Sequence, residues 1–525
     1  MTQSGLTRLV SSHPSATMVP MSTATTTVNF DPFLPSSAPR LKDFQHVGIA
    51  YALANTQDGK GTWIADEQGL GKTVQAITAS VVHLMVHNPK GKVLIICKSA
   101  LKGVWQRELA RFAPQLDVQI LGGRKPYETT SQVCLINFDV LAAWKSQLVK
   151  EGFQVMVIDE SHYVKEIKTQ RTKAALEVAR DIRSRRGMVL LLSGTPLLNR
   201  PVELVTQLMI MGRLQDIAPR PEDGKSWAKA FKRTFCDMKW NGYAWEAKGA
   251  KNLDLLNTRM RGNCMIRRLR KNVLDMAETE RYQVPLNLNG GLNEYRRIEE
   301  TFQPKHPASE ALELLGALRQ AVELAKIPAA VEWVEDFLAD NEEQRDPQTG
   351  QVTQTAKKLV VWATHIPAQV ETARALNAAG VETVLLREAT TPQEIEAAKA
   401  RFNEGSARVI VCSLAMHREG HTLLGDGTNV TDSLFLSQPW HPGAVSQAED
   451  RISRIGRTAE AVFAWTLICP DTVDEWLATL IAEKWATFRA AADGTISEAE
   501  EGSIRDALLT KLRDHMRAKY GRSPL

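Results

Sequence analysis

From Arg40 onward, short apolar runs rich in β-branched residues alternate with longer stretches that mix polar and apolar residues. A short run of apolar residues without polar partners predicts a strand that is buried on both faces. Strands of this kind, separated by helices, are typical of a parallel sheet with helices on both sides. The first half of the chain therefore predicts one α/β unit, with strands at Val93–Cys97, Val118–Leu121, Val133–Asn137, Val155–Asp159 and Val189–Ser193.

The same alternation returns after about residue 356 and predicts a second α/β unit. Between the two units, residues 200 to about 260 hold several tryptophans and no clear strand, so we expect a mostly helical insertion. Residues 286–355 predict a helical linker that ends in a polar loop, Asp346–Gln351. The strands of the second unit are expected at Lys358–Trp362, Glu382–Leu386, Val409–Cys412, Ser433–Leu436 and Val462–Ile468.

Residues 476–525 predict C-terminal helices. Apolar residues recur there every four positions, at Ile504, Leu508, Leu512 and Met516, beside several basic residues. This spacing favours a helix that docks on the core and exposes a solvated basic face, and a DNA contact is the alternative.

The first 38 residues are rich in Ser, Thr and Pro, and Arg8 and Asp31 are their only charged residues. Such a segment has too little apolar content to fold, so residues 1–38 predict a disordered tail. A transit peptide is one alternative, and a natural start at Met18 or Met21 is another.

The composition excludes several classes of protein. The 525 residues correspond to roughly three or four domain-sized units, and the net charge of +5 is too small to argue for nucleic acid by itself. No apolar run is long enough to span a membrane. The six cysteines lack any C-x-x-C pair and mostly lie in apolar runs, which favours buried reduced thiols over disulfides or zinc ligands.

The segment from Ala65 to Thr73 has the layout of a phosphate-binding loop. A short apolar run ends at Ala65, the glycines Gly69 and Gly71 follow, and a helix-like segment begins beyond Lys72 and Thr73. Backbone N–H groups at such a helix start attract phosphates. In this pattern the lysine reaches the β- and γ-phosphates of ATP, and the hydroxyl of Thr73 binds Mg²⁺.

The match to this motif is incomplete, because Asp66 stands at the position of the first glycine. An ordinary strand–turn–helix corner is therefore the alternative interpretation of the segment.

Three further segments carry chemistry. Asp159 and Glu160 follow an apolar strand, where they can hold Mg²⁺ and polarise an attacking water, although acidic turn residues are the alternative. Ser193 and Thr195 end another strand and can respond to the phosphate, or form a plain turn. Arg451 and Arg454 are three residues apart on one helix face, and can stabilise a transferring phosphoryl group or form a solvated basic face.

Taken together, these segments resemble the Swi/Snf family of superfamily-two helicase-like ATPases, and look most like its annealing-helicase branch. The resemblance covers about residues 40–485, in matching motif order, and Asp66 replaces glycine in this family as a rule. The motifs that carry the resemblance are Leu41–Gln45, Ala65–Gln75, Cys97–Leu101 with Trp105 and Glu108, Ile136–Asp139, Asp159–His162 with Lys165, Ser193–Asn199, Gly249–Leu253, Met265–Lys271, Ser413–Leu423 and Gln447–Arg457.

The resemblance implies an α/β fold of two RecA-like lobes, with a first ATP-binding lobe at residues 39–285 and a second lobe at residues 356–475. It implies that Gln45 reads adenine, that Gln447 also lies at the nucleotide, and that lobe two supplies Arg451 and Arg454 to an ATP and Mg²⁺ site built on lobe one. It further implies backbone contacts to double-stranded or forked DNA from Lys102, Asn137, Thr195, Lys271 and Ser413.

Three departures from the family pattern concern DNA contact and coupling. Met416–Arg418 stands where glycine-rich residues are usual, Leu386–Glu388 where Asp-Gly is usual, and Arg457 where Gln is usual.

The expected function is a DNA-dependent ATPase that translocates on or remodels double-stranded DNA. A fork-remodelling or annealing helicase, and a catalytically silent nucleotide-switched module, are the alternatives. We expect the protein in the cytoplasm of a bacterium or a virus-infected cell, or in the nucleus if it is eukaryotic.

Overall fold

The structure is a computed structural model that divides into two compact units, Met1–Leu274 and Asp275–Leu525. Each unit is described by itself below. The residues that the structure describes are 28–56, 59–194, 201–240, 242, 245–274, 279–288, 291–301, 309–387, 391–414, 423–439, 442–449, 451–452, 461–490 and 498–520.

The first unit is built on a seven-stranded sheet in which every pairing is parallel. Because parallel strands point the same way, all their carboxyl ends meet at one edge, where ligands bind in open α/β sheets. The predicted strands are confirmed to within a residue, and the strand order is β3 (Val118–Ile120), β4 (Val133–Asn137), β2 (Val93–Cys97), β5 (Val155–Asp159), β6 (Met188–Leu192), β1 (Thr62–Ile64) and β9 (Met265–Ile266).

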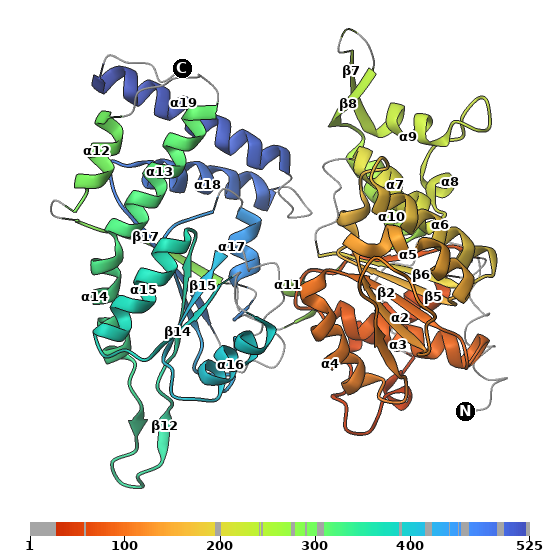
Figure 1. Cartoon of the computed structure of the whole chain (residues 1–525), viewed down its shortest axis with the longest axis horizontal. Coiled ribbons are helices and arrows are strands. Elements are labelled where there is room, and N and C mark those ends of the chain that lie inside the picture. The colour runs from red at the N-terminus through yellow and green to blue at the C-terminus, as the bar shows by residue number, and fades with distance from the viewer. Residues whose placement is uncertain are drawn as a thin grey trace. The chain divides into compact units, whose positions relative to one another are not determined.

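Helices cover both faces of this sheet, as Figure 1 shows. Successive residues of each strand point into two different hydrophobic clusters, so that Ile95 packs on one face and Ile96 on the other. On the first face lie α2 (Asp43–Asn55), α3 (Lys72–His87) and α4 (Lys102–Phe112). On the opposite face lie α5 (Phe138–Glu151), α6 (Gln170–Ser184), α7 (Pro201–Met211) and α10 (Leu253–Asn263).

The insertion after α7 is only partly helical, which corrects the sequence prediction. The helices α8 (Leu214–Ile217) and α9 (Trp227–Phe235) are present. They are followed by an antiparallel hairpin of β7 (Cys236–Trp240) and β8 (Trp245–Ala250). The alternation in this hairpin is obscured because lysines and small residues separate its aromatic positions, so its period-two pattern is weak.

The tail prediction is also wrong in part. Residues 28–38 are packed against the first unit: Phe30 is buried and its backbone N–H donates to His46 Nδ1 over 3.1 Å. A short 3-10 helix, η1 (Asp31–Phe33), lies there, and the Asp31 carboxylate accepts the Leu41 N–H over 2.9 Å. Residues 1–27 of the predicted tail lie outside the described residues.

The second unit is built on a six-stranded sheet that is also parallel throughout. Its strand order is β10 (Thr279–Pro285), β17 (Val462–Ile468), β16 (Asp432–Phe435), β13 (Leu359–Ala363), β15 (Val409–Ser413) and β14 (Thr383–Leu386). Residues 279–285 were assigned to the first lobe from the sequence. They pair instead with β17 along its whole length, so they belong to the second sheet.

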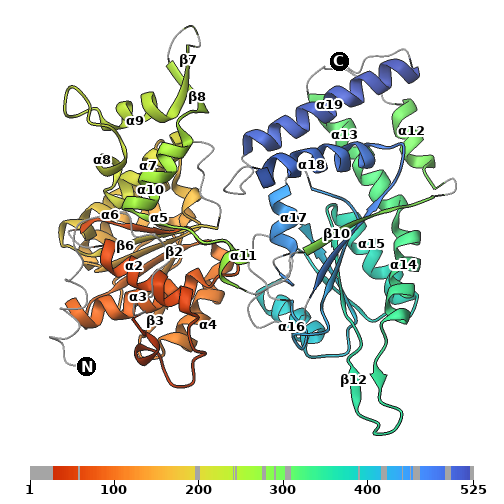
Figure 2. The same ribbon diagram turned by 180° about the vertical axis from the view of Figure 1, so that it is seen from behind.

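Helices cover this second sheet on both faces as well (Figure 2). α14 (Ile327–Asp340) and α15 (Ile366–Ala378) pack on one face, while α16 (Pro392–Asn403) and α17 (Pro442–Glu449) pack on the other. Both units are therefore RecA-like α/β lobes. Where the sequence predicted only a polar loop after α14, a small hairpin of β11 (Gln344–Arg345) and β12 (Val352–Gln354) is present.

A separate helical cluster completes the second unit. It joins α12 (Asn293–Thr301), α13 (Ser309–Ala325), α18 (Val473–Ala490) and α19 (Glu498–Tyr520). In α19, Leu508, Leu512 and Met516 are buried, which confirms the prediction of a docking helix.

All six cysteines are buried and free, as the sequence predicted. Among the helices of the described residues, none combines the length and the apolar character needed to cross a membrane.

Candidate functional site

The phosphate-loop segment lies at the carboxyl edge of the first sheet, between β1 and α3. Gly71 is the N-cap of α3 and has a φ of 71°, and Gly69 has a φ of 82°, a backbone region that favours glycine. A Cβ atom at Gly71 would lie 2.4 Å from Gln45 Nε2, so any side chain there would be strained by the positive φ and would have to displace Gln45. The loop therefore leaves the first N–H groups of α3 without a side-chain cap at the N-cap position, as an anion-binding helix start requires.

Lys72 is the first residue of α3, and its ammonium turns back over the loop. It donates to the carbonyl oxygens of Asp66 at 2.9 Å and Glu67 at 3.2 Å. Burial lowers the pKa of Lys72, and the nearby charges of Glu160, Asp66 and Asp159 act in the opposite direction. The lysine thus lies within the field of the acidic pair, although the two motifs are far apart in the sequence.

Asp66, the residue at the position of the missing glycine, is fully buried and does not face a phosphate position. Its two carboxylate oxygens accept from the backbone N–H, Nε and Nη2 of Arg268 and from Gln75 Nε2, the last over 3.1 Å. Arg268 also donates to Gln75 Oε1 over 2.8 Å and to the carbonyl of Phe44. This buried network joins the loop, α2, α3 and β9.

The backbone on either side of Asp66 is held in the same way. The N–H groups of Ala65 and Glu67 donate to the carbonyls of Ile266 and Arg268, over 2.8 and 2.9 Å. Arg267 Nη1 donates to the Ala65 carbonyl over 2.8 Å and to the Gly194 carbonyl over 3.3 Å. The segment Met265–Lys271 was identified from the sequence only as a family marker. In the structure, its hydrogen bonds hold the backbone of the loop in place.

Gln45, which was predicted to read adenine, contacts the loop. It is buried at the start of α2, and its Nε2 donates to the Leu70 carbonyl over 3.3 Å. Its Oε1 accepts the N–H of Lys42 over 2.9 Å, which caps the helix start. The side chain is thereby fixed beside Gly71.

Asp159 and Glu160 end β5, two strands from β1 in the sheet order. Asp159 Oδ2 accepts the indole N–H of Trp105 over 2.9 Å, and Oδ1 accepts the N–H of Glu160 over 3.0 Å. Burial, together with the adjacent charge of Glu160, raises the pKa of Asp159. The indole N–H opposes this rise because it stabilises the carboxylate, a role of Trp105 that the sequence did not reveal.

Glu160 has a φ of 51°, which is uncommon for a residue with a side chain and directs the two acids differently. Burial alone would raise the pKa of Glu160, but His162 and the charges of Lys72 and Lys98 outweigh it, so this pKa is lowered. His162 Nδ1 lies 3.3 Å from Glu160 Oε2. The adjacent carboxylates therefore differ in acidity, one shifted up and the other down, which suits two different tasks.

The acidic motif is tied to α7 by two contacts that sequence analysis missed. Ser161 Oγ donates to Gln207 Oε1 over 2.8 Å in a buried position, and Lys165 Nζ lies 3.3 Å from Glu203 Oε2. Both partners lie on α7, where only their spacing of four residues hints at a shared face.

Gly194, in the motif that follows β6, lies beside the phosphate-loop residues Gln68 and Lys72. A Cβ atom there would lie 2.5 Å from Gln68 Cγ and 3.4 Å from Lys72 Nζ. Ser193 is buried, and Thr195 lies outside the described residues.

The residues expected to contact DNA are placed in different ways. Lys102 Nζ donates to Asn137 Oδ1 over 2.7 Å and to the Leu121 carbonyl over 2.8 Å, so these two candidates contact each other. Burial lowers the pKa of Lys102. Ser413 is buried at the end of β15. Lys271 lies on α11 (Arg270–Val273), with its side chain outside the described residues.

In the second unit, Arg451 lies two residues beyond the end of α17 and is buried. Its carbonyl accepts the N–H of Leu423 over 3.1 Å. Glu449, two residues earlier, accepts two hydrogen bonds from Arg281 on β10, at 2.8 and 2.6 Å. Gln447 lies on α17 but its side chain, like the whole of Arg454, is outside the described residues.

The residues of the first unit fit a magnesium-bound nucleoside triphosphate. The helix start offers uncapped N–H groups beside Lys72, a hydroxyl lies on Thr73 in the first turn of α3, and oxygen ligands lie on Asp159. Oxygen ligands are those that Mg²⁺ prefers. Fold and site together define the class of P-loop nucleotide-binding proteins.

Comparison with known proteins gives the family. The SNF2-related domain matches residues 44–312, which is more than half of the chain. The chain therefore belongs to the SNF2-related family, as the motifs predicted.

The chain is 29% identical over 455 residues to a bovine (Bos taurus) protein named SWI/SNF-related matrix-associated actin-dependent regulator of chromatin subfamily A-like protein 1. This covers 85% of this chain and 44% of the relative. A mouse (Mus musculus) protein named DNA annealing helicase and endonuclease ZRANB3 is 26% identical over 483 residues, covering 86% of this chain and 41% of the relative. The chain thus spans less than half the length of these relatives. The solved Sulfolobus solfataricus SWI2/SNF2 ATPase core in complex with dsDNA is 20% identical, with 90% of this chain and 97% of that chain covered and a TM-score of 0.40.

Proposed function

We propose that this chain is a DNA-stimulated ATPase that uses ATP hydrolysis to move along or remodel double-stranded DNA. The observation that carries this proposal is the gathering of Lys72, Asp159 and Glu160 at one edge of the first sheet, within the range of one another's charges. Support for DNA as the partner comes from family membership and from the names of the relatives.

Each residue has a distinct task in this proposal. Lys72 would exchange its loop carbonyls for phosphate oxygens. Thr73 and Asp159 would hold a magnesium ion, which would neutralise part of the phosphate charge. Glu160, ionised at neutral pH because its pKa is lowered, orients a water molecule and accepts its proton. Trp105 keeps Asp159 oriented through its indole N–H.

Arg451 and Arg454 act in the second lobe in this proposal. Guanidinium groups brought to a transferring phosphoryl group stabilise charge that develops in the transition state. The pair of the buried Glu449 and the exposed Arg281 anchors α17, the helix that precedes both arginines, to β10. Nucleotide chemistry can then report on the position of the second lobe through domain closure.

The test compares purified wild-type protein with Lys72→Ala and Glu160→Gln, measuring ATP turnover with no DNA, single-stranded, double-stranded and forked DNA, and RNA. We expect stimulation by DNA in the wild type, loss of turnover by at least a hundredfold in both variants, and DNA binding that is nearly unchanged. Glu177→Gln is the control, because this exposed carboxylate pairs with Lys145 at the surface. Retained turnover in Glu160→Gln would refute the assignment of the site.

Fork remodelling with strand annealing is the second candidate, and the annealing helicases among the relatives favour it. A strand-annealing assay on forked DNA separates it from simple translocation. Tight ATP binding without turnover on any DNA would instead favour a nucleotide-switched module.

A further inference from the structure

The insertion after α7 has a high net positive charge. Residues 225–251 contain seven basic residues and only two acidic residues, whereas the whole chain of 525 residues has a net charge of +5. This short segment alone therefore accounts for as much net charge as the entire chain. The basic residues are Lys225, Lys229, Lys232, Arg233, Lys239, Lys248 and Lys251.

The helix α9 separates this charge from the core. Phe231 and Phe235 are fully buried on one side of α9, and their rings pack together with centroids 5.0 Å apart. Lys229 and Arg233 lie on the exposed side. The helix is thus fixed by its apolar face and presents its cations to solvent.

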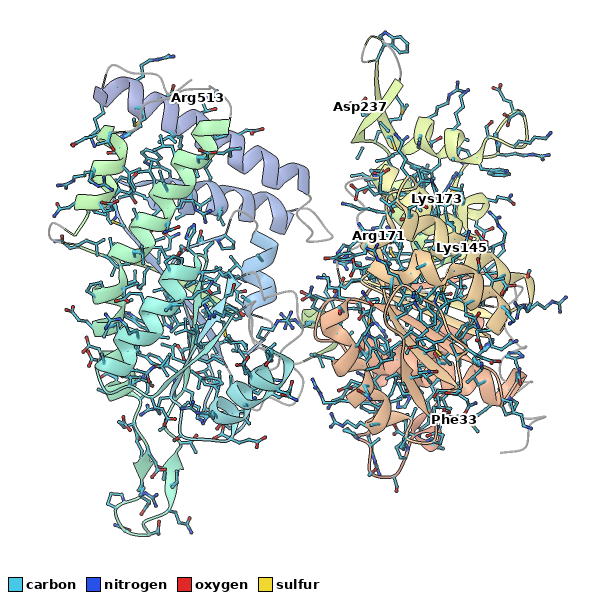
Figure 3. All side chains as sticks on the ribbon, in the orientation of Figure 1. Phe33, Lys145, Arg171, Lys173, Asp237 and Arg513 are labelled. Atoms are coloured by element: carbon cyan, nitrogen blue, oxygen red, sulfur yellow. The ribbon has the colours of Figure 1, made fainter. Side chains whose placement is uncertain are left out.

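The hairpin that follows is firmly mounted at its base. Cys236 is buried and pairs with Ala250. Next to this pair, the N–H of Lys251 donates to the Phe235 carbonyl over 3.0 Å, and Asn252 Nδ2 donates to the Thr234 carbonyl over 2.8 Å. In Figure 3 the hairpin stands away from the body of the first unit, with Asp237 labelled near its base.

The other end of the hairpin exposes an aromatic residue. Trp240 pairs in register with Trp245, and its side chain is 56% exposed. Among the large hydrophobic side chains of the described residues, none is more exposed. A tryptophan with this much of its side chain in solvent offers an aromatic surface to a ligand.

We infer that α9 and the β7–β8 hairpin form a binding element for unpaired bases where duplex DNA opens, with the indole of Trp240 stacked on a base and the exposed cations of α9 on the adjoining phosphates. This inference rests on the proposed function, since it takes DNA as the partner. Aromatic faces combined with basic side chains are the chemistry that holds single strands, because every base offers a π-face and every nucleotide a phosphate. Inside a duplex the bases are already stacked on one another, so an exposed indole can stack on a base only where pairing ends.

The experiment uses the full chain and two DNAs of equal length, a blunt duplex and a fork. The fork carries 2-aminopurine at its first unpaired position, whose fluorescence falls when an aromatic ring stacks on it. We expect Trp240→Ala to weaken fork binding about tenfold or more, to leave blunt-duplex binding within about twofold, and to abolish the fluorescence change. Trp240→Phe should restore most of the fork affinity, since a smaller ring can still stack.

Tyr127→Ala is the matched control, because Tyr127 is another exposed aromatic residue of the first unit, 43% exposed, that lies outside the insertion. It should bind both DNAs like the wild type. The charge reversal of Lys229→Glu with Arg233→Glu should weaken fork binding more steeply at low salt than at high salt.

Unchanged fork affinity in Trp240→Ala, or an equal loss on the fork and the blunt duplex, would overturn the inference and leave a protein partner as the better occupant. Failure of the proposed function would look different, because none of the DNAs would then stimulate ATP turnover in the wild type. Fork binding and the 2-aminopurine signal would still decide the role of the hairpin.

Discussion

Replacing Asp66 with glycine would bring the loop closer to the usual phosphate-loop pattern, and we expect it to damage the protein. Asp66 is fully buried, and its carboxylate is the counter-charge of Arg268, which is 5% exposed. In Asp66→Gly the guanidinium would stay buried without that partner. Removing one member of a buried ion pair costs about 3–5 kcal/mol. The loss should fall on the first unit, where β1, β9, α2 and α3 meet at this network.

Hydrogen exchange followed by mass spectrometry measures this loss locally, on peptides that contain residues 62–68 and 265–271. Because 1.4 kcal/mol corresponds to a factor of ten, we expect protection there to fall by about two to three orders of magnitude. Peptides from the sheet of the second unit should be unaffected. The exposed pair of Lys145 and Glu177 gives the control, since surface pairs contribute about 0–1 kcal/mol.

A double-mutant cycle separates pairing from other effects. Arg268→Met alone should also destabilise the loop, because the Asp66 carboxylate would lose two of its four donors. The backbone donor of Arg268 remains, so this loss should be smaller. If the two residues act as a pair, the combined variant should cost much less than the sum of the single variants. Additive losses, or a loss of protection below tenfold in Asp66→Gly, would refute the reasoning.

Two further predictions follow from buried groups. Trp105→Phe removes the N–H that stabilises the Asp159 carboxylate, so the pKa of Asp159 should rise further. The loss of ATP turnover on acidification should then begin about one pH unit higher than in the wild type. An unchanged pH profile would contradict this. Lys326→Met should destabilise the second unit by about 3–5 kcal/mol, because the fully buried ammonium pairs with Asp474 and donates to the Leu436 and Leu467 carbonyls, whereas the exposed Arg374→Met should cost less than about 1 kcal/mol in the same urea titration.

Most strands of the two sheets were predictable because they are buried on both faces and are therefore mainly apolar. Val93–Cys97, Val133–Asn137 and Val462–Ile468 were predicted with the bounds that the structure has. The short strand β9 and the exposed strand β10 were not predicted. Met265–Ile266 is too short to show a period, and most of Thr279–Pro285 is exposed and polar at the edge of its sheet.

The site was predictable as a set of motifs but not as a set of contacts. Local sequence marks Lys72 and Asp159, because glycine loops and acidic strand ends have recognisable patterns. It does not mark Arg268 as the partner of Asp66, since the two are separated by 202 positions and only the fold brings them together. The indole of Trp105 and the serine–glutamine bond of Ser161 and Gln207 were missed for the same reason.

Those long-range contacts connect the nucleotide edge with the basic insertion. Ser161, next to Glu160, bonds to Gln207 on α7, and α7 packs against α9 and β8. The path from the acid to the base of the hairpin therefore runs through one buried hydrogen bond and a single helix within one unit. A phosphate-dependent change at Glu160 can influence the insertion only if α7 has two arrangements. These must differ both in the bond from Ser161 to Gln207 and in the packing of α7 on α9 and β8. The motif Ser193–Asn199 leads directly into α7, so the same chain segment that lies beside Lys72 at Gly194 also begins the helix that supports the hairpin.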